Sequence, residues 1–97
     1  MTTHEDIYID LLDRIIENEK ALYGELAVTI ARNTGELLVS DKGKVLEIHN
    51  TPKKIIQDLS YEYGKLDGTI SKNYIDSIVS IYKTLHPDLD LPLSSKN

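Results

Sequence analysis

The chain has 97 residues, a formal net charge of −5 and no cysteine. This length predicts a single domain over residues 1–97, and the lack of cysteine excludes disulfides, cysteine-ligated zinc and thiol catalysis. The acidic balance argues against a nonspecific nucleic-acid binder, whose phosphate contacts require clustered Lys and Arg. No apolar run approaches the roughly 18 residues that a membrane span needs, and the amino terminus lacks a basic region followed by an apolar block. We therefore expect a soluble, cytoplasmic protein without membrane contact.

The first half of the chain predicts a long helix over residues 4–33, because its apolar residues recur three and four positions apart. Thr3 is a suitable N-cap for this helix. The pattern fades before Gly35, which suits the left-handed residue that commonly follows a helix. Gly24 lies within the run and lowers helix propensity, so a break is allowed near residues 19–24.

Two short aliphatic and β-branched runs, residues 36–40 and 45–49, flank Asp41-Lys42-Gly43-Lys44. Such runs around a turn that contains Asp and Gly predict a β-hairpin over residues 36–49. Gly43 would supply the positive φ that a short hairpin loop requires. A two-stranded hairpin is marginal in water, so we expect it to pack against a helix.

A second helical region is predicted over residues 52–85, because Thr51 is a suitable N-cap and Pro52 suits the first helical position. Its apolar residues are spaced three or four apart and keep their phase through Asp67-Gly68. These residues are Ile55, Ile56, Leu59, Tyr63, Leu66, Ile70, Tyr74, Ile78, Tyr82 and Leu85. The region is therefore either one long helix with a flexible point or two helices in near alignment.

The helical region ends at His86-Pro87, since the residue before a proline disfavours the helical conformation. Alternating charged and apolar residues then predict an extended tail over residues 86–97 that packs along a surface. Together the elements predict an α+β, mostly helical fold: a long N-terminal helix, one β-hairpin, and a long or bipartite C-terminal helical region packed antiparallel to the first helix. We expect the two apolar stripes to face each other.

The segment Asp67-Gly68-Thr69-Ile70-Ser71 resembles the middle of an EF-hand calcium loop. With Gly68 at loop position six, positions one and three are Tyr63 and Lys65, and Asp67 is the one carboxylate in a ligand position. Calcium requires six to eight oxygen ligands, so the segment is interpreted as turn chemistry. The three histidines and the serines also lack partners at catalytic or metal-binding spacing. We therefore predict no catalytic residue, no metal site and no cofactor.

Two groups of residues are candidates for protein contacts. The first is an acidic ridge, with members four, three and four positions apart on the first helix: Asp6, Asp10, Asp13 and Glu17. The ridge is interpreted either as a docking face for a basic partner or loose divalent cation, or as a solvated face. The second group is Tyr63, Tyr74 and Tyr82, whose amphipathic rings suit a core edge or an interface.

These patterns predict a small acidic, non-enzymatic interaction module that acts as a homodimer or as a subunit or regulator of a larger assembly. Two long amphipathic helices carry more apolar surface than one small monomer readily buries, and open hairpin edges could pair with a second copy. The alternative is a small-ligand sensor with an apolar pocket between the helices and the hairpin. A further alternative is a winged-helix-like DNA-binding regulator, although the hairpin tip offers only Lys42 and Lys44.

Overall fold

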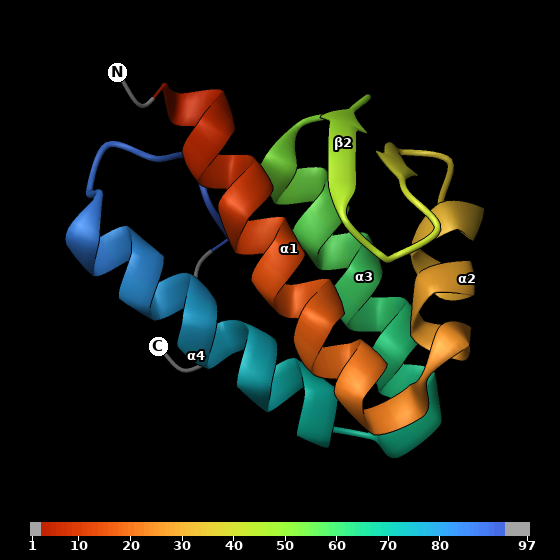
Figure 1. Cartoon of the computed structure of the whole chain (residues 1–97). Coiled ribbons are helices and arrows are strands. Elements are labelled where there is room, and N and C mark those ends of the chain that lie inside the picture. The colour runs from red at the N-terminus through yellow and green to blue at the C-terminus, as the bar shows by residue number, and fades with distance from the viewer. Residues whose placement is uncertain (1–2, 93–97) are drawn as a thin grey trace.

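The structure is a computed structural model that describes residues 3–92. In chain order its elements are α1 (His4–Tyr23), α2 (Glu25–Asn33), β1 (Leu37–Val39), β2 (Val45–Ile48), α3 (Pro52–Asp67) and α4 (Ile70–Leu85). β1 and β2 form an antiparallel hairpin that lies against α2 and α1 (Figure 1). The predicted α+β, mostly helical fold with one hairpin is confirmed.

The predicted first helix is divided into two by Gly24, within the region where a break was allowed. Thr3 caps α1 through a reciprocal pair of hydrogen bonds, in which Asp6 N donates to Thr3 Oγ1 at 3.1 Å and Thr3 N donates to Asp6 Oδ2 at 3.2 Å. Gly24 has φ +63°, which an L side chain rarely adopts. The chain reverses there, so α2 returns alongside α1 (Figure 1).

The hairpin forms as predicted, with strands shorter than the two apolar runs. Val39 lies opposite Val45, and a bulge follows Leu38. Gly43, in the connecting loop, has φ +84°, and a Cβ at this position would lie 3.3 Å from Cγ2 of Val28. Glycine accepts both this dihedral and this close approach, so the tip of the loop can pack onto the helices.

α3 begins at the predicted position, where the side chain of Thr51 accepts a hydrogen bond from Lys54 N at 3.3 Å. The prediction that the helical region continues in near alignment beyond Asp67 is wrong. At Gly68, with φ +69°, the chain turns back and α4 packs against α3 (Figure 1). A helical repeat read through a glycine cannot detect such a reversal, because the spacing of apolar residues on either side of it is unchanged.

The reversal also changes which face of the last helix is buried. Leu66, Ile70 and Leu85 belong to the predicted stripe, yet they are 40%, 65% and 66% exposed. The core-facing residues of α4 are Tyr82, which belongs to the predicted stripe, and Ser71, Ile75 and Val79, which do not. The predicted stripe therefore holds along α3 as far as Tyr63 and fails at Leu66 and at both ends of α4.

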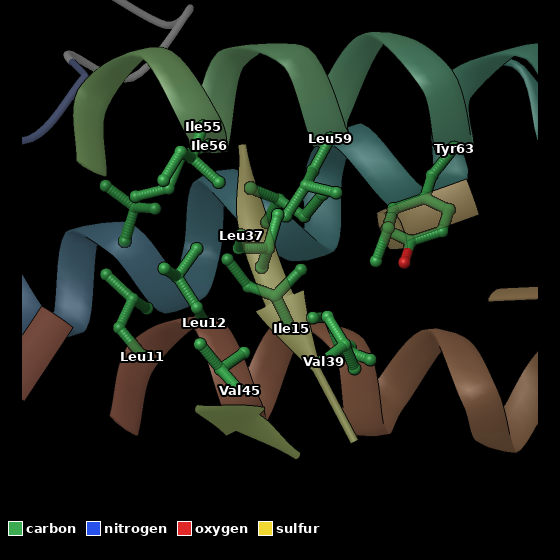
Figure 2. Close-up of a cluster of buried hydrophobic side chains, with 14 of the residues drawn as sticks. Leu11, Leu12, Ile15, Leu37, Val39, Val45, Ile55, Ile56, Leu59 and Tyr63 are labelled. Carbon is green, nitrogen blue, oxygen red and sulfur yellow. The ribbon is translucent and has the colours of Figure 1, made fainter. Parts of the chain in front are cut away.

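The core lies between α1, α3 and the hairpin (Figure 2). The side chains that meet there, each at most 5% exposed, are Leu11, Leu12, Ile15, Leu37, Val39, Val45, Ile55, Ile56 and Leu59. The stripes of α1 and α3 therefore face each other, as predicted. The accessible surface of 5789 Å² is close to the roughly 5,600 Å² of a monomer of this mass. The stripes of α1 and α3 are thus largely buried within one chain, with α2 and the hairpin as the second layer, whereas part of the stripe on α4 stays exposed.

The two halves of the C-terminal helical region run in different directions relative to α1. The C-terminal ends of α1 and α3 meet, because the Tyr23 hydroxyl donates to Asp67, so these helices run in the same direction (Figure 1). α4 is antiparallel to α1, since the Tyr82 hydroxyl donates to Asp10 near the start of α1. The predicted antiparallel packing against the first helix is thus provided by α4.

The tail packs on the helices through two buried residues, Leu89 and Leu91. The backbone N–H of Asp90 also donates to the hydroxyl of Tyr8 at 2.9 Å. The part of the predicted tail from residue 93 to residue 97 lies outside the described residues. Within the described range, no helix combines the length and the apolar character needed to cross a bilayer.

Candidate interaction surface

The middle of the acidic ridge is used inside the molecule. Oδ1 of Asp13 accepts a hydrogen bond from the backbone N–H of Val45 at 2.7 Å, at the start of β2. Asp10 accepts from the hydroxyl of Tyr82 and lies 3.6 Å from the guanidinium of Arg14. The ridge therefore attaches α1 to the hairpin on one side and to α4 on the other.

The two ends of the ridge are exposed and also have partners in the chain. Asp6 belongs to the N-terminal capping pair of α1. Glu17 lies 3.8 Å from the ammonium of Lys44 in the hairpin loop. Lys20, one turn further along α1, donates to the carbonyl oxygen of Lys42 at 3.1 Å. The ridge and the loop are thus complementary in charge, and the ridge is not an unoccupied acidic surface.

The three tyrosines occupy different environments. Tyr63 is fully buried, and its hydroxyl donates to the carbonyl oxygen of Ala27 at 2.8 Å; burial raises the pKa of this hydroxyl. Tyr82 is 7% exposed, and burial together with the hydrogen bond to Asp10 raises its pKa to about 12. Neither ring is open to a partner, so both belong to the core of the single chain. Tyr74 is half-buried at the edge of the core.

The solvent side of α4 carries no charged side chain. Seven exposed residues make up this side, which we name the α4 outer face: Ile70, Asn73, Ser77, Ser80, Ile81, Thr84 and Leu85. At 3.6 residues per turn they cover about 140° of the helix circumference. The three charged residues of the helix, Lys72, Asp76 and Lys83, are partly buried and lie to one side of this arc.

The apolar members of the α4 outer face are well exposed. Ile70, Ile81 and Leu85 are 65%, 53% and 66% exposed, and the half-buried Tyr74 lies between Ile81 and Leu85 around the helix. Figure 1 shows α4 at the edge of the molecule, with α1 and α3 on one side of it and no other labelled element on the other. Isolated exposed apolar residues are common, whereas a whole helix side without charge is unusual in a chain with 28% charged residues.

Sequence reasoning placed Ile70 and Leu85 in the core and did not select Ile81. A signal for the correct assignment was present, because Ile75 and Val79 form a second apolar row on α4, four positions apart. α4 is thus apolar on two sides. Periodicity alone could not decide which side faces the core.

An apolar groove of about 330 Å³ lies between α3 and α4. Ile56, Ile75 and Val79 form its floor, and Lys72 and Asp76, 3.2 Å apart, stand at its side. The space between helices and hairpin, where a ligand pocket was predicted, is occupied by the core side chains of Figure 2. This groove therefore lies between two helices and not between the helices and the hairpin.

Two further observations bear on the kind of site. Among residues 3–92, no three His, Cys, Asp or Glu side chains lie close enough together to hold a metal ion. Comparison of the chain with protein-family models, with curated proteins and with solved structures gave no match.

Proposed function

We propose that this protein is a non-enzymatic interaction module that forms a homodimer through the α4 outer face. The observation that carries the proposal is the combination of exposure and lack of charge over one entire side of a 16-residue helix. Three exposed apolar residues of this side, Ile70, Ile81 and Leu85, are separated only by uncharged polar residues, and apolar residues grouped on one surface mark interaction sites more often than scattered ones do. The half-buried ring of Tyr74 would lie within this contact.

A second copy of the chain is the partner proposed for this uncharged helix side, and charge restricts where it can bind. A net charge of −5 on each chain opposes self-association, so a contact between two copies requires a surface that places no like charges opposite each other. The α4 outer face meets this condition, and a two-fold axis would pair it with itself. The acidic ridge does not meet it, because like charges would then face each other across the axis.

The size of the face predicts a weak dimer. A helix of 16 residues is about 24 Å long, and one pair of such helices buries less than the roughly 1,200 Å² that stable complexes exceed. We therefore expect association at high micromolar protein concentration. Exchange between monomer and dimer would be rapid.

The proposal is tested by sedimentation velocity over a wide concentration range with Ile81→Glu. The wild-type weight-average mass is expected to rise with concentration. The variant is expected to remain at 11.0 kDa, because two glutamates would face each other across the interface. A wild-type mass that stays at the monomer value at millimolar concentration would rule out the homodimer.

Leu46→Glu is the matched control. Leu46, on β2, is 54% exposed, against 53% for Ile81, so both variants place a carboxylate at an equally exposed apolar position. We expect the control to associate as the wild type does. Loss of association in Leu46→Glu alone would place the interface at the hairpin edge instead.

The groove between α3 and α4 favours a second candidate, binding of a small apolar ligand. Its volume of about 330 Å³ is at the lower limit of the roughly 300–1,000 Å³ typical of ligand sites. Val79→Trp would fill the groove from its floor. Ligand-induced chemical-shift changes at Ile75 that disappear in this variant would support binding, and their absence across an apolar fragment library would argue against it.

A further inference from the structure

Four polar side chains join α1 to the turn between α3 and α4. Glu19 and Tyr23 belong to α1, Asp67 ends α3, and Ser71 is in the first turn of α4. Oγ of Ser71 lies 2.7 Å from Oε1 of Glu19 and 2.6 Å from Oδ2 of Asp67. The hydroxyl of Tyr23 donates to the same Oδ2. One serine hydroxyl thus bridges two carboxyl groups.

The number of available hydrogens restricts the protonation of this cluster. A hydroxyl carries one hydrogen, so Ser71 donates to only one of the two carboxyl groups. Asp67 already accepts from Tyr23 and, at Oδ1, from the backbone N–H of Ser71 at 3.0 Å, which is the environment of an ionised carboxylate. If the Ser71 hydroxyl donates its one hydrogen to Asp67, the hydrogen in the short contact between Ser71 and Glu19 has to come from Glu19.

On balance the surroundings of Glu19 disfavour a negative charge, because burial outweighs the nearby Ser71 hydroxyl and Asn18 amide, which favour the ionised form. Glu19 is fully buried, and its Oε2 has no hydrogen-bond partner among residues 3–92. The titratable groups that face it are Tyr23 on α1 and Tyr63 and Asp67 on α3, none of which carries positive charge. The adjacent Lys20 donates to the hairpin loop instead. A buried carboxylate without a cation is strongly unfavourable, so the neutral acid is the form that fits.

We propose that Glu19 is a proton-dependent latch, which in its neutral form donates to Ser71 and holds the first turn of α4 against α1. In the closed latch a chain of hydrogen bonds runs from the Glu19 acid to the Ser71 hydroxyl and on to the Asp67 carboxylate. Loss of the proton would place two negative groups on either side of one serine. The first turn of α4 would then loosen.

The two carboxyl groups have opposite effects on the pH dependence of folding. Burial raises the pKa of Glu19 above 4.5, so its stabilisation is complete below that pH and is lost as pH rises through the folded-state value. Hydrogen bonds from Ser71 and Tyr23 lower the pKa of Asp67 below 3.8, so its stabilisation is present above that pH and lost on acidification. The latch is therefore most stable in mildly acidic solution.

Glu19→Gln tests the latch, because glutamine keeps the shape of the side chain, donates to Ser71 and cannot ionise. The measurement is the unfolding equilibrium constant from denaturant titrations between pH 4.5 and pH 8, at a protein concentration that keeps the chain monomeric. The ratio of the wild-type constant to the variant constant is expected to increase about tenfold per pH unit until Glu19 ionises in the folded state. Monomeric conditions make this result independent of the proposed homodimer.

Glu17→Gln is the matched control, since Glu17 lies on the same helix with a side chain 77% exposed. The ratio of wild-type to control constants is expected to stay flat with pH. An equally flat ratio for Glu19→Gln would overturn the proposal. If Glu19→Gln does not fold, the ¹³C titration of the Glu19 carboxyl carbon in the wild type decides: a midpoint above the ordinary value of 4.5 supports the latch, and a midpoint at or below that value overturns it.

Discussion

α1 and α4 are both amphipathic helices, but they differ in what covers the side away from the core. On α1 that side bears the acidic ridge, whose central residues Asp10 and Asp13 are bound by Tyr82 and by the backbone of Val45. On α4 that side bears the uncharged α4 outer face, against which no labelled element packs in Figure 1. A charged surface can thus be structural, and an uncharged one can be the surface open to a partner.

The largest difference between the helices is expected in their contribution to stability. Leu12→Ala removes a fully buried side chain of α1 and is expected to lower the free energy of unfolding by about 2–5 kcal/mol. Ile81→Ala, at an exposed position of α4, is expected to change it by less than about 0.5 kcal/mol. Urea titrations of dilute protein measure both values. Similar losses in the two variants would show that the α4 outer face is buried in the monomer.

Asp13→Ala tests whether the acidic ridge is structural. It leaves the N–H of Val45 without its acceptor, so we expect a loss of about 1–2 kcal/mol and faster amide exchange at Val45. Glu17→Ala removes an exposed ion pair with a separation of 3.8 Å and is expected to cost less than about 0.5 kcal/mol. Equal, small effects from both substitutions would indicate that the ridge is a solvated surface after all.

A smaller effect is expected at the hydrogen bond that joins the two helices. Tyr82→Phe removes the hydroxyl bound to Asp10 and is expected to cost about 1 kcal/mol at neutral pH. Because the pKa of Tyr82 is raised from 10.0 to about 12, the wild type should lose stability as pH rises from 10 toward 12. The variant should lose less over that interval.

Tyr61→Phe provides the comparison for this pH effect, since Tyr61 is 67% exposed. Unfolding followed by circular dichroism at pH 9, 10, 11 and 12 distinguishes the variants. If Tyr82→Phe and the wild type lose stability in parallel above pH 10, the hydroxyl of Tyr82 is not held by α1.

The features of the structure that were predicted correctly depend on neighbouring residues in the chain or on a helix with one buried face. The cap at Thr3, the start of α3 at Thr51 and the hairpin around Gly43 follow from residue type and neighbouring backbone geometry. The facing stripes of α1 and α3 were predictable because each helix has a single row of regularly spaced apolar residues, and that row has to face the core. The sequence left Tyr63 and Tyr82 open between a core edge and an interface, because a tyrosine suits both equally well; their burial places both rings in the core of the single chain.

By itself, the sequence determined the class of fold, the chain positions of its elements, and the lack of cysteine chemistry and of clustered positive charge. These properties depend on composition and on contacts between near neighbours. Only the tertiary structure decided the reversal at Gly68, the side of α4 that remains uncovered and the meeting of Glu19 with Ser71, 52 residues away in the chain. Each of these depends on how one helix is rotated and placed against another, and a helix with two apolar sides carries no local signal that selects between them.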